Sequence, residues 1–86
     1  MIYRIEISRK AQRELKKLPR DAQERIKVVI DSLAIDPRPS GCRKMVNEDR
    51  AYRIRVGVYR VIYEIFDDVL VVEVVRLGHR QGVYED

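Results

Sequence analysis

One stretch decides the fold of this 86-residue chain: AYRIRVGVYRVIYEIF, residues 51–66. Polar and apolar side chains alternate through 51–56 and again through 59–66, which is the period of a half-buried β-strand. The two runs are separated only by Gly57 and Val58, and a Gly-X pair suits the two-residue type II′ turn of a β-hairpin. The stretch therefore predicts a pair of antiparallel strands.

The residues that follow extend this pair. Asp67-Asp68 predicts a second tight turn, and the nearly continuous apolar run 69–77 is typical of an inner strand. The polar segment 78–86, which contains two glycines, indicates a loop leading off that strand. A three-strand antiparallel meander is therefore expected over 51–77.

The residues that precede the hairpin predict a strand and two helices. Residues 2–7 alternate as a half-buried strand, and Ser8 suits the N-cap of a helix. Apolar residues then recur at helical spacing up to about residue 35, with a break at Pro19 and a loop at 36–41. The whole order is β-α-α-β-β-β, an α+β fold with a helical hairpin on one face of a mainly antiparallel sheet. The pattern leaves open where the first strand inserts in the sheet.

Composition narrows the class of protein. The length suits one domain, residues 1–86, and 18 Lys and Arg against 14 Asp and Glu give a net charge of +4. This charge suggests a polyanionic partner, although mild basicity is also common without one. One cysteine, Cys42, and one histidine, His79, allow no disulfide within the chain and make a protein-built zinc site unexpected. We expect no metal and no cofactor, a cytoplasmic location, and neither a signal peptide nor a membrane span at the charged N-terminus.

Strand parity gathers arginines on one face of the predicted hairpin. The apolar residues of 51–56 should pack on the helices, which leaves Arg53 and Arg55 on the open face. A two-residue turn places Arg55 opposite Arg60 and puts Glu64 on the same face. Like charges directly opposite each other destabilise a sheet unless an anion or a carboxylate relieves them. A solvated charged face is the alternative, but the planar fork of arginine fits a phosphate in a bidentate manner, which favours binding of a nucleic-acid backbone.

The C-terminal segment adds candidates to this face. An antiparallel meander brings the end of its third strand beside the start of its second, so we expect His79 and Arg80 near Arg60, with Tyr84 within reach. Taken alone, His79 is equally well explained as a solvent-exposed histidine and Tyr84 as an aromatic that packs a loose terminus.

The chain resembles toxins of the RelE/ParE superfamily from bacterial toxin–antitoxin modules. The resemblance runs over nearly the whole chain and is carried by ELKKLP at 14–19, YRIRVGVYRVIYEI at 52–65 and GHRQGVY at 78–84. RelE-type members cut mRNA in the ribosomal A site, whereas ParE-type members poison DNA gyrase. The basic residues Arg53 and Arg55, with an arginine and a tyrosine in the closing motif, resemble the nuclease branch.

This resemblance implies a metal-independent endoribonuclease, an mRNA interferase that inhibits translation. The 2′-hydroxyl would attack the adjacent phosphorus, leaving a 2′,3′-cyclic phosphate and a 5′-hydroxyl. Arg60 and Arg80 are the candidates for stabilising the phosphorane. Tyr84 is the candidate base, with a pKa lowered by nearby arginines, and His79 is the alternative proton carrier.

Other roles and partners follow from the same resemblance. Arg53 and Arg55 would hold the RNA backbone, because a guanidinium does not readily give up a proton. The implied partners are a cognate antitoxin, the ribosome with its mRNA, and operator DNA only through the antitoxin complex, with no membrane. Two alternatives stay open: a gyrase poison on the same fold, and a non-catalytic basic subunit of a repressor complex.

Overall fold

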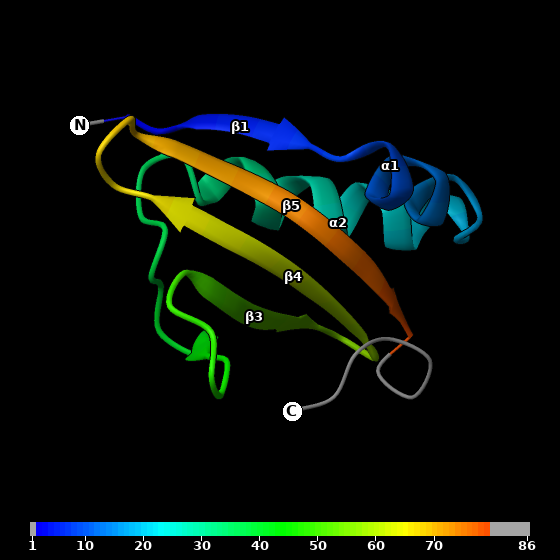
Figure 1. Ribbon diagram of the computed structural model, residues 1–86. Helices are drawn as coiled ribbons and strands as arrows, with labels where there is room; N and C mark the ends of the chain where they lie inside the picture. Colours follow the sequence, from blue (N-terminus) through cyan, green and yellow to red (C-terminus); the bar gives the residue numbers. More distant parts are fainter. Residues whose placement is uncertain (1, 80–86) are drawn as a thin grey trace.

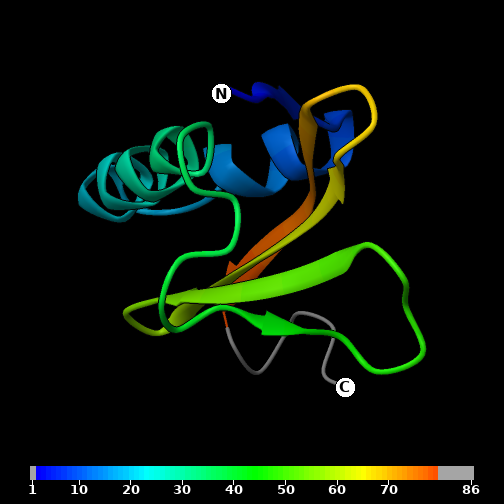
Figure 2. The ribbon, with the colours of Figure 1, turned by 90° about the vertical axis from the view of Figure 1, so that its left-hand side faces the viewer.

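The computed structural model describes residues 2–79 of the chain, and it has the predicted α+β architecture (Figure 1). Its elements are β1 (Arg4–Ile7), α1 (Arg9–Lys16), α2 (Arg20–Ser32), β2 (Arg43–Lys44), β3 (Ala51–Val56), β4 (Tyr59–Phe66) and β5 (Val71–His79). Both helices lie on one side of a strongly twisted sheet (Figure 2). None of the described residues 2–79 forms a helix on the other side of the sheet, which is called the open side below.

The sheet has the strand order β1-β5-β4-β3-β2. The strand β1 runs parallel to β5 at one edge, and every other pairing is antiparallel. This settles the position of the first strand, which the sequence pattern left open. The two-residue strand β2 at the opposite edge was not predicted, because two residues are too few to show an alternation.

The predicted hairpin register is confirmed. Val56 pairs with Tyr59 and Arg55 with Arg60 across the turn at Gly57 and Val58. Gly57 has a φ of 63° and Val58 has no positive φ, as a type II′ turn requires. This register decides which side chains of β3 and β4 face the helices.

The last strand is shifted from its predicted range of 69–77 to Val71–His79. Leu70 has a φ of 55° and belongs to the turn after β4, so it cannot start the strand. A register shift between Ile62 and Tyr63, which pair with Arg76 and Val74, leaves Val75 as an extra residue. This bulge resets the alternation of β5, which otherwise would turn Leu77 away from the core.

Local signals account for the helical hairpin. The Ser8 side chain caps α1 by accepting a hydrogen bond of 3.1 Å from the Ala11 amide, and α2 begins directly after Pro19. Apolar stripes of both helices join the inner faces of β3, β4 and β5 in one core. Its buried members are Ala11, Leu15, Ile26, Ile30, Leu33, Val56, Val61, Tyr63, Ile65, Val72, Val74 and Leu77.

A buried tyrosine ties the loop after α2 to this core. The Tyr63 hydroxyl donates a 2.8 Å hydrogen bond to the carbonyl of Pro37, which is also buried. Burial, and then the neighbouring Cys42 thiol, raise the pKa of Tyr63 far above its ordinary value. The tyrosine therefore stays neutral and serves as a structural donor.

Candidate nucleic-acid interface

An arginine cluster occupies the open side of the sheet, as strand parity predicts. Arg55 lies directly opposite Arg60, and Arg53 lies opposite Ile62. Arg55 is exposed, whereas Arg53 and Arg60 are partly buried. The alternate residues of the same strands pack into or against the core on the helix side, so the three guanidinium groups share the face that no helix covers.

The unpredicted strand β2 adds a fourth arginine. Arg43 pairs with Arg53 in the antiparallel β2–β3 ladder and is exposed. Residues paired in this way point to the same side of a sheet, so Arg43 extends the cluster toward the sheet edge. We refer to Arg43, Arg53, Arg55 and Arg60 together as the arginine face. The sequence offered no strand signal at Arg43 from which to find it.

His79 lies next to Arg60 in the β4–β5 ladder, as expected, but its ring does not join the arginine face. Its strand position is next to Gly78, which pairs with Arg60, but His79 itself pairs with Tyr59. The two rings meet edge to face, with centroids 6.1 Å apart at 81°, and Tyr59 packs against the helix-side core. The bulge at Val75 is the physical reason, since it sets which of the last residues of β5 face the helices.

Arg80 and Tyr84 lie outside the described residues 2–79. Their proximity to Arg60 and their roles stay predictions. The described strand ends at His79, one residue before Arg80, and this places the start of the closing motif at the same end of the sheet as Arg55 and Arg60.

The end of β5 that leads to this motif is held by α1. One carboxylate oxygen of Glu14 accepts from the Leu77 amide at 2.9 Å, and the other accepts from the Arg76 guanidinium at 3.0 and 3.3 Å. The Glu14 and Arg76 side chains are only 20% and 34% exposed, which strengthens this ion pair relative to a surface pair. Ser8 fixes the bulge itself, because its amide donates to the Val74 carbonyl and its hydroxyl to the Val75 carbonyl. These contacts fix the position of the C-terminal end of β5.

A second polar network ties down the opposite end of the sheet. Asp67 accepts a 2.6 Å hydrogen bond from the Tyr3 hydroxyl and a bidentate pair from Arg38 at 2.8 and 3.3 Å. Arg38 also donates to the Tyr52 hydroxyl at 3.1 Å. Hydrogen bonding from Arg38 and then from Tyr3 lowers the pKa of Asp67. The network joins the residue before β1, the loop after α2, β3 and the β4–β5 turn, and so holds these segments in fixed positions relative to one another.

Replacing Asp67 by asparagine should therefore make the protein less stable at neutral pH but not in acid. The lowered pKa means that the Asp67 carboxylate stabilises the folded state above the ordinary carboxyl pKa, and this contribution disappears as the pH falls through the folded-state pKa. Thermal melts of the parent and Asp67→Asn from neutral to acid pH should converge at low pH. The exposed neighbour Asp68→Asn is the matched control, and a difference that is the same at every pH would contradict the assignment.

The described residues 2–79 contain no group of three or more His, Cys, Asp or Glu side chains placed to hold a metal ion. Within the same residues no helix has the length and apolarity needed to cross a membrane. The guanidinium groups of the arginine face can bind and stabilise an anion but are poor proton carriers.

Comparison with known proteins defines the class: the protein is a toxin of a type II toxin–antitoxin system. The chain belongs to the RelE/ParE superfamily, since the model of the family described as "ParE toxin of type II toxin-antitoxin system, parDE" matches residues 5–84. The resemblance found in the sequence is thereby confirmed.

Individual relatives carry the RelE name. Toxin RelE3 of Methanocaldococcus jannaschii is 30% identical over 77 residues, which are 85% of this chain and 85% of the relative. The archaeal RelE–RelB complex of Pyrococcus horikoshii OT3 matches with a TM-score of 0.84 and 28% identity, covering 96% of this chain and 100% of that one. The toxin–antitoxin complex RelBE2 of Mycobacterium tuberculosis matches at 0.79 and 26%, covering 93% and 100%.

Proposed function

We propose that this toxin is a ribosome-dependent endoribonuclease that cleaves mRNA in the A site. The carrying observation is the arginine face, where Arg55 and Arg60 stand directly opposite each other and Arg43 stands opposite Arg53. Like charges so placed destabilise the sheet, and the phosphates of an RNA strand relieve them. The RelE relatives of the chain support the same reading.

The proposed reaction needs one proton removed, one supplied and a phosphorane stabilised. The 2′-hydroxyl attacks the adjacent phosphorus, and the bond to the 5′-oxygen of the next nucleotide breaks. Arg60 and Arg80 are the proposed cations that stabilise the developing charge, while Arg53 and Arg55 hold the backbone. Tyr84 is the proposed base, because the helix-side position of the His79 ring leaves the histidine less well placed.

The test is to map the 5′ ends of mRNA on programmed ribosomes with and without the protein. Cuts within the A-site codon that leave a 5′-hydroxyl are expected, and they should persist in single-turnover reactions with EDTA under conditions that keep ribosomes intact. Loss of cleavage when a protein-bound divalent ion is removed would contradict the metal-free mechanism.

The gyrase poison is the second candidate, because the matching family model is that of ParE toxins. It predicts DNA breaks in the presence of gyrase and intact mRNA on ribosomes. An absence of both effects would leave only the role of a basic subunit in a repressor complex.

A cognate antitoxin is the proposed partner, and the cytoplasm is the proposed location. Relatives of this fold form RelE–RelB complexes, and a toxin encoded alone would harm its host. We expect the product of the neighbouring gene to bring an acidic, partly disordered segment that folds on binding. Size-exclusion chromatography after co-expression should show one complex, and elution of the toxin as an unaccompanied monomer would count against this partner.

A further inference from the structure

The open side of the sheet carries a second charge cluster, of the opposite sign. Glu6 pairs with Glu73 across β1 and β5, and Glu73 pairs with Glu64 across β5 and β4. The residues on either side of each glutamate pack into or against the helix-side core, so all three carboxylates face the open side. Arg4 forms an ion pair with Glu6 at 2.9 Å. Because this contact is exposed, it offsets only part of the repulsion among the three carboxylates.

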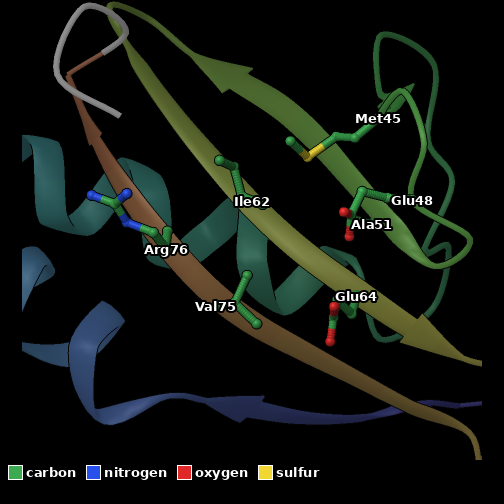
Figure 3. A pocket seen from close by; sticks show the side chains of 7 residues that line it. All are labelled: Met45, Glu48, Ala51, Ile62, Glu64, Val75 and Arg76. Atoms are coloured by element: carbon green, nitrogen blue, oxygen red, sulfur yellow. The ribbon is translucent and has the colours of Figure 1, made fainter. Parts of the chain in front are cut away.

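An apolar hollow separates this glutamate row from the arginine face. Its floor is formed by Met45, Ala51, Ile62 and Val75, and its volume is about 220 Å³. Glu64 lies toward one end of the hollow and Arg76 toward the other, with Glu48 on the rim (Figure 3). Ile62 is only 4% exposed, so the hollow is a packed surface and not a set of scattered side chains.

Three kinds of surface therefore follow one another along β4. Arg60, Ile62 and Glu64 are two residues apart and face the same side, so the arginine and the glutamate stand roughly 13 Å apart along the strand. A ligand that lies along this strand meets a cation, an apolar seat and an anion in that order.

We propose that the hollow docks a segment of a partner polypeptide that carries a bulky apolar side chain between an acidic and a basic residue. The apolar side chain fills the hollow, the acidic residue meets the arginine face, and the lysine or arginine meets the glutamate row. An RNA strand suits only the arginine face, because its phosphates would be repelled by Glu64 and Glu73. The inference rests on the proposed function in taking this partner to be the antitoxin, whose bound segment would cover Arg60 and so block RNA.

The glutamate row gives this docking its selectivity. A purely acidic segment could neutralise the arginines but would be repelled at the row, so the toxin would discriminate against antitoxins that lack the basic residue. Exposed charge pairs give modest affinity each, and the apolar anchor supplies most of the binding.

The test uses fluorescein-labelled peptides with one leucine between two charged residues, measured by fluorescence anisotropy. One peptide carries Asp and Lys, a second carries two Asp and a third two Lys, each made with the charges two residues from leucine, as in a strand, and four, as in a helix. The Asp–Lys peptide should bind about three- to ten-fold more tightly than the two-Asp peptide. Replacing its leucine by alanine should weaken binding by about ten-fold or more.

Variants of the toxin locate the effect. Glu64→Gln combined with Glu73→Gln should abolish the preference for the Asp–Lys peptide, whereas Glu24→Gln on the exposed side of α2 should leave it unchanged. The proposal is overturned if no peptide binds, if the Asp–Lys and two-Asp peptides bind equally, or if the preference survives in the double variant. If the double variant instead binds a single-stranded RNA much more tightly and shows no preference among the peptides, the hollow is part of an RNA-binding surface and not a docking site for a polypeptide.

These outcomes are independent of the nuclease assay. If the protein prefers the Asp–Lys peptide but cuts no RNA, the docking surface is supported and the proposed nuclease activity is wrong. If the protein cuts mRNA but shows no preference among the peptides, the nuclease activity is supported and the docking surface is wrong.

Discussion

Arg60→Ala is expected to slow single-turnover cleavage on saturating programmed ribosomes by about 10²–10³, the usual loss for one preorganised donor to a developing oxyanion. The physical reason is the position of Arg60 on the arginine face, opposite Arg55 and next to Gly78 near the end of β5. A loss in the rate of the chemical step at saturation separates stabilisation of the phosphorane from RNA binding.

Folding should hardly change in this variant. Arg60 points away from the helix-side core, and its removal relieves repulsion with Arg55, so the free energy of unfolding should stay within about 0.5 kcal/mol of the parent. Thermal melts beside the kinetics check this. A melting temperature far below that of the parent would make Arg60 a structural residue.

Arg53→Ala is the matched comparison, because it removes the same group from the same face. It should weaken RNA binding. The slope of the logarithm of the binding constant against the logarithm of the salt concentration should become shallower by about 0.7, the value for one lost phosphate contact on a single strand. If Arg60→Ala cuts at the parental rate, the arginine face is a docking surface and not a catalytic one.

Tyr84→Phe is expected to reduce the rate of the same step by about 10²–10⁴, which is the range for loss of a general acid or base. The change keeps the ring and removes only the hydroxyl, so it tests proton transfer without a change in size. The parental pH–rate profile should show an ionisation that is absent from Tyr84→Phe.

His79→Gln is the informative partner of this variant. The ring of His79 meets Tyr59 on the helix side, so its replacement should leave the rate within a few-fold and keep the profile. Our assignment would be contradicted if Tyr84→Phe cut at the parental rate and His79→Gln lost the ionisation from its pH–rate profile. The histidine would then be the residue that removes the proton.

Much of the fold was predictable because its signals are local. Alternation in 51–56 and 59–66, with a Gly-X turn between them, predicted the hairpin and its register, which the structure confirms. Ser8 and Pro19 marked the helical hairpin in the same way, since caps and breaks act within one turn of a helix. The strand β2 and the shifted start of β5 were missed because one is too short to alternate and the other depends on the φ of Leu70.

The candidate site was predicted only in part, for a related reason. Arg53, Arg55 and Arg60 follow from parity within one hairpin, whereas Arg43 and the row of Glu6, Glu73 and Glu64 arise from pairings between strands far apart in the sequence. The order of the meander placed His79 beside Arg60, which the pairing of His79 with Tyr59 bears out, but the side that its ring faces depends on the bulge at Val75.

The amino-acid sequence by itself determined the family, the order of the elements and the arginines of the hairpin, because these depend on composition and on contacts between near neighbours. The tertiary structure alone decided that β1 runs parallel to β5 at the sheet edge, and this pairing brings Glu6 beside Glu73. It also decided that Glu14 of α1 braces the end of β5. Such pairings depend on which of several possible edges a strand or helix meets when the core closes, and that choice is made by the packing of the whole molecule.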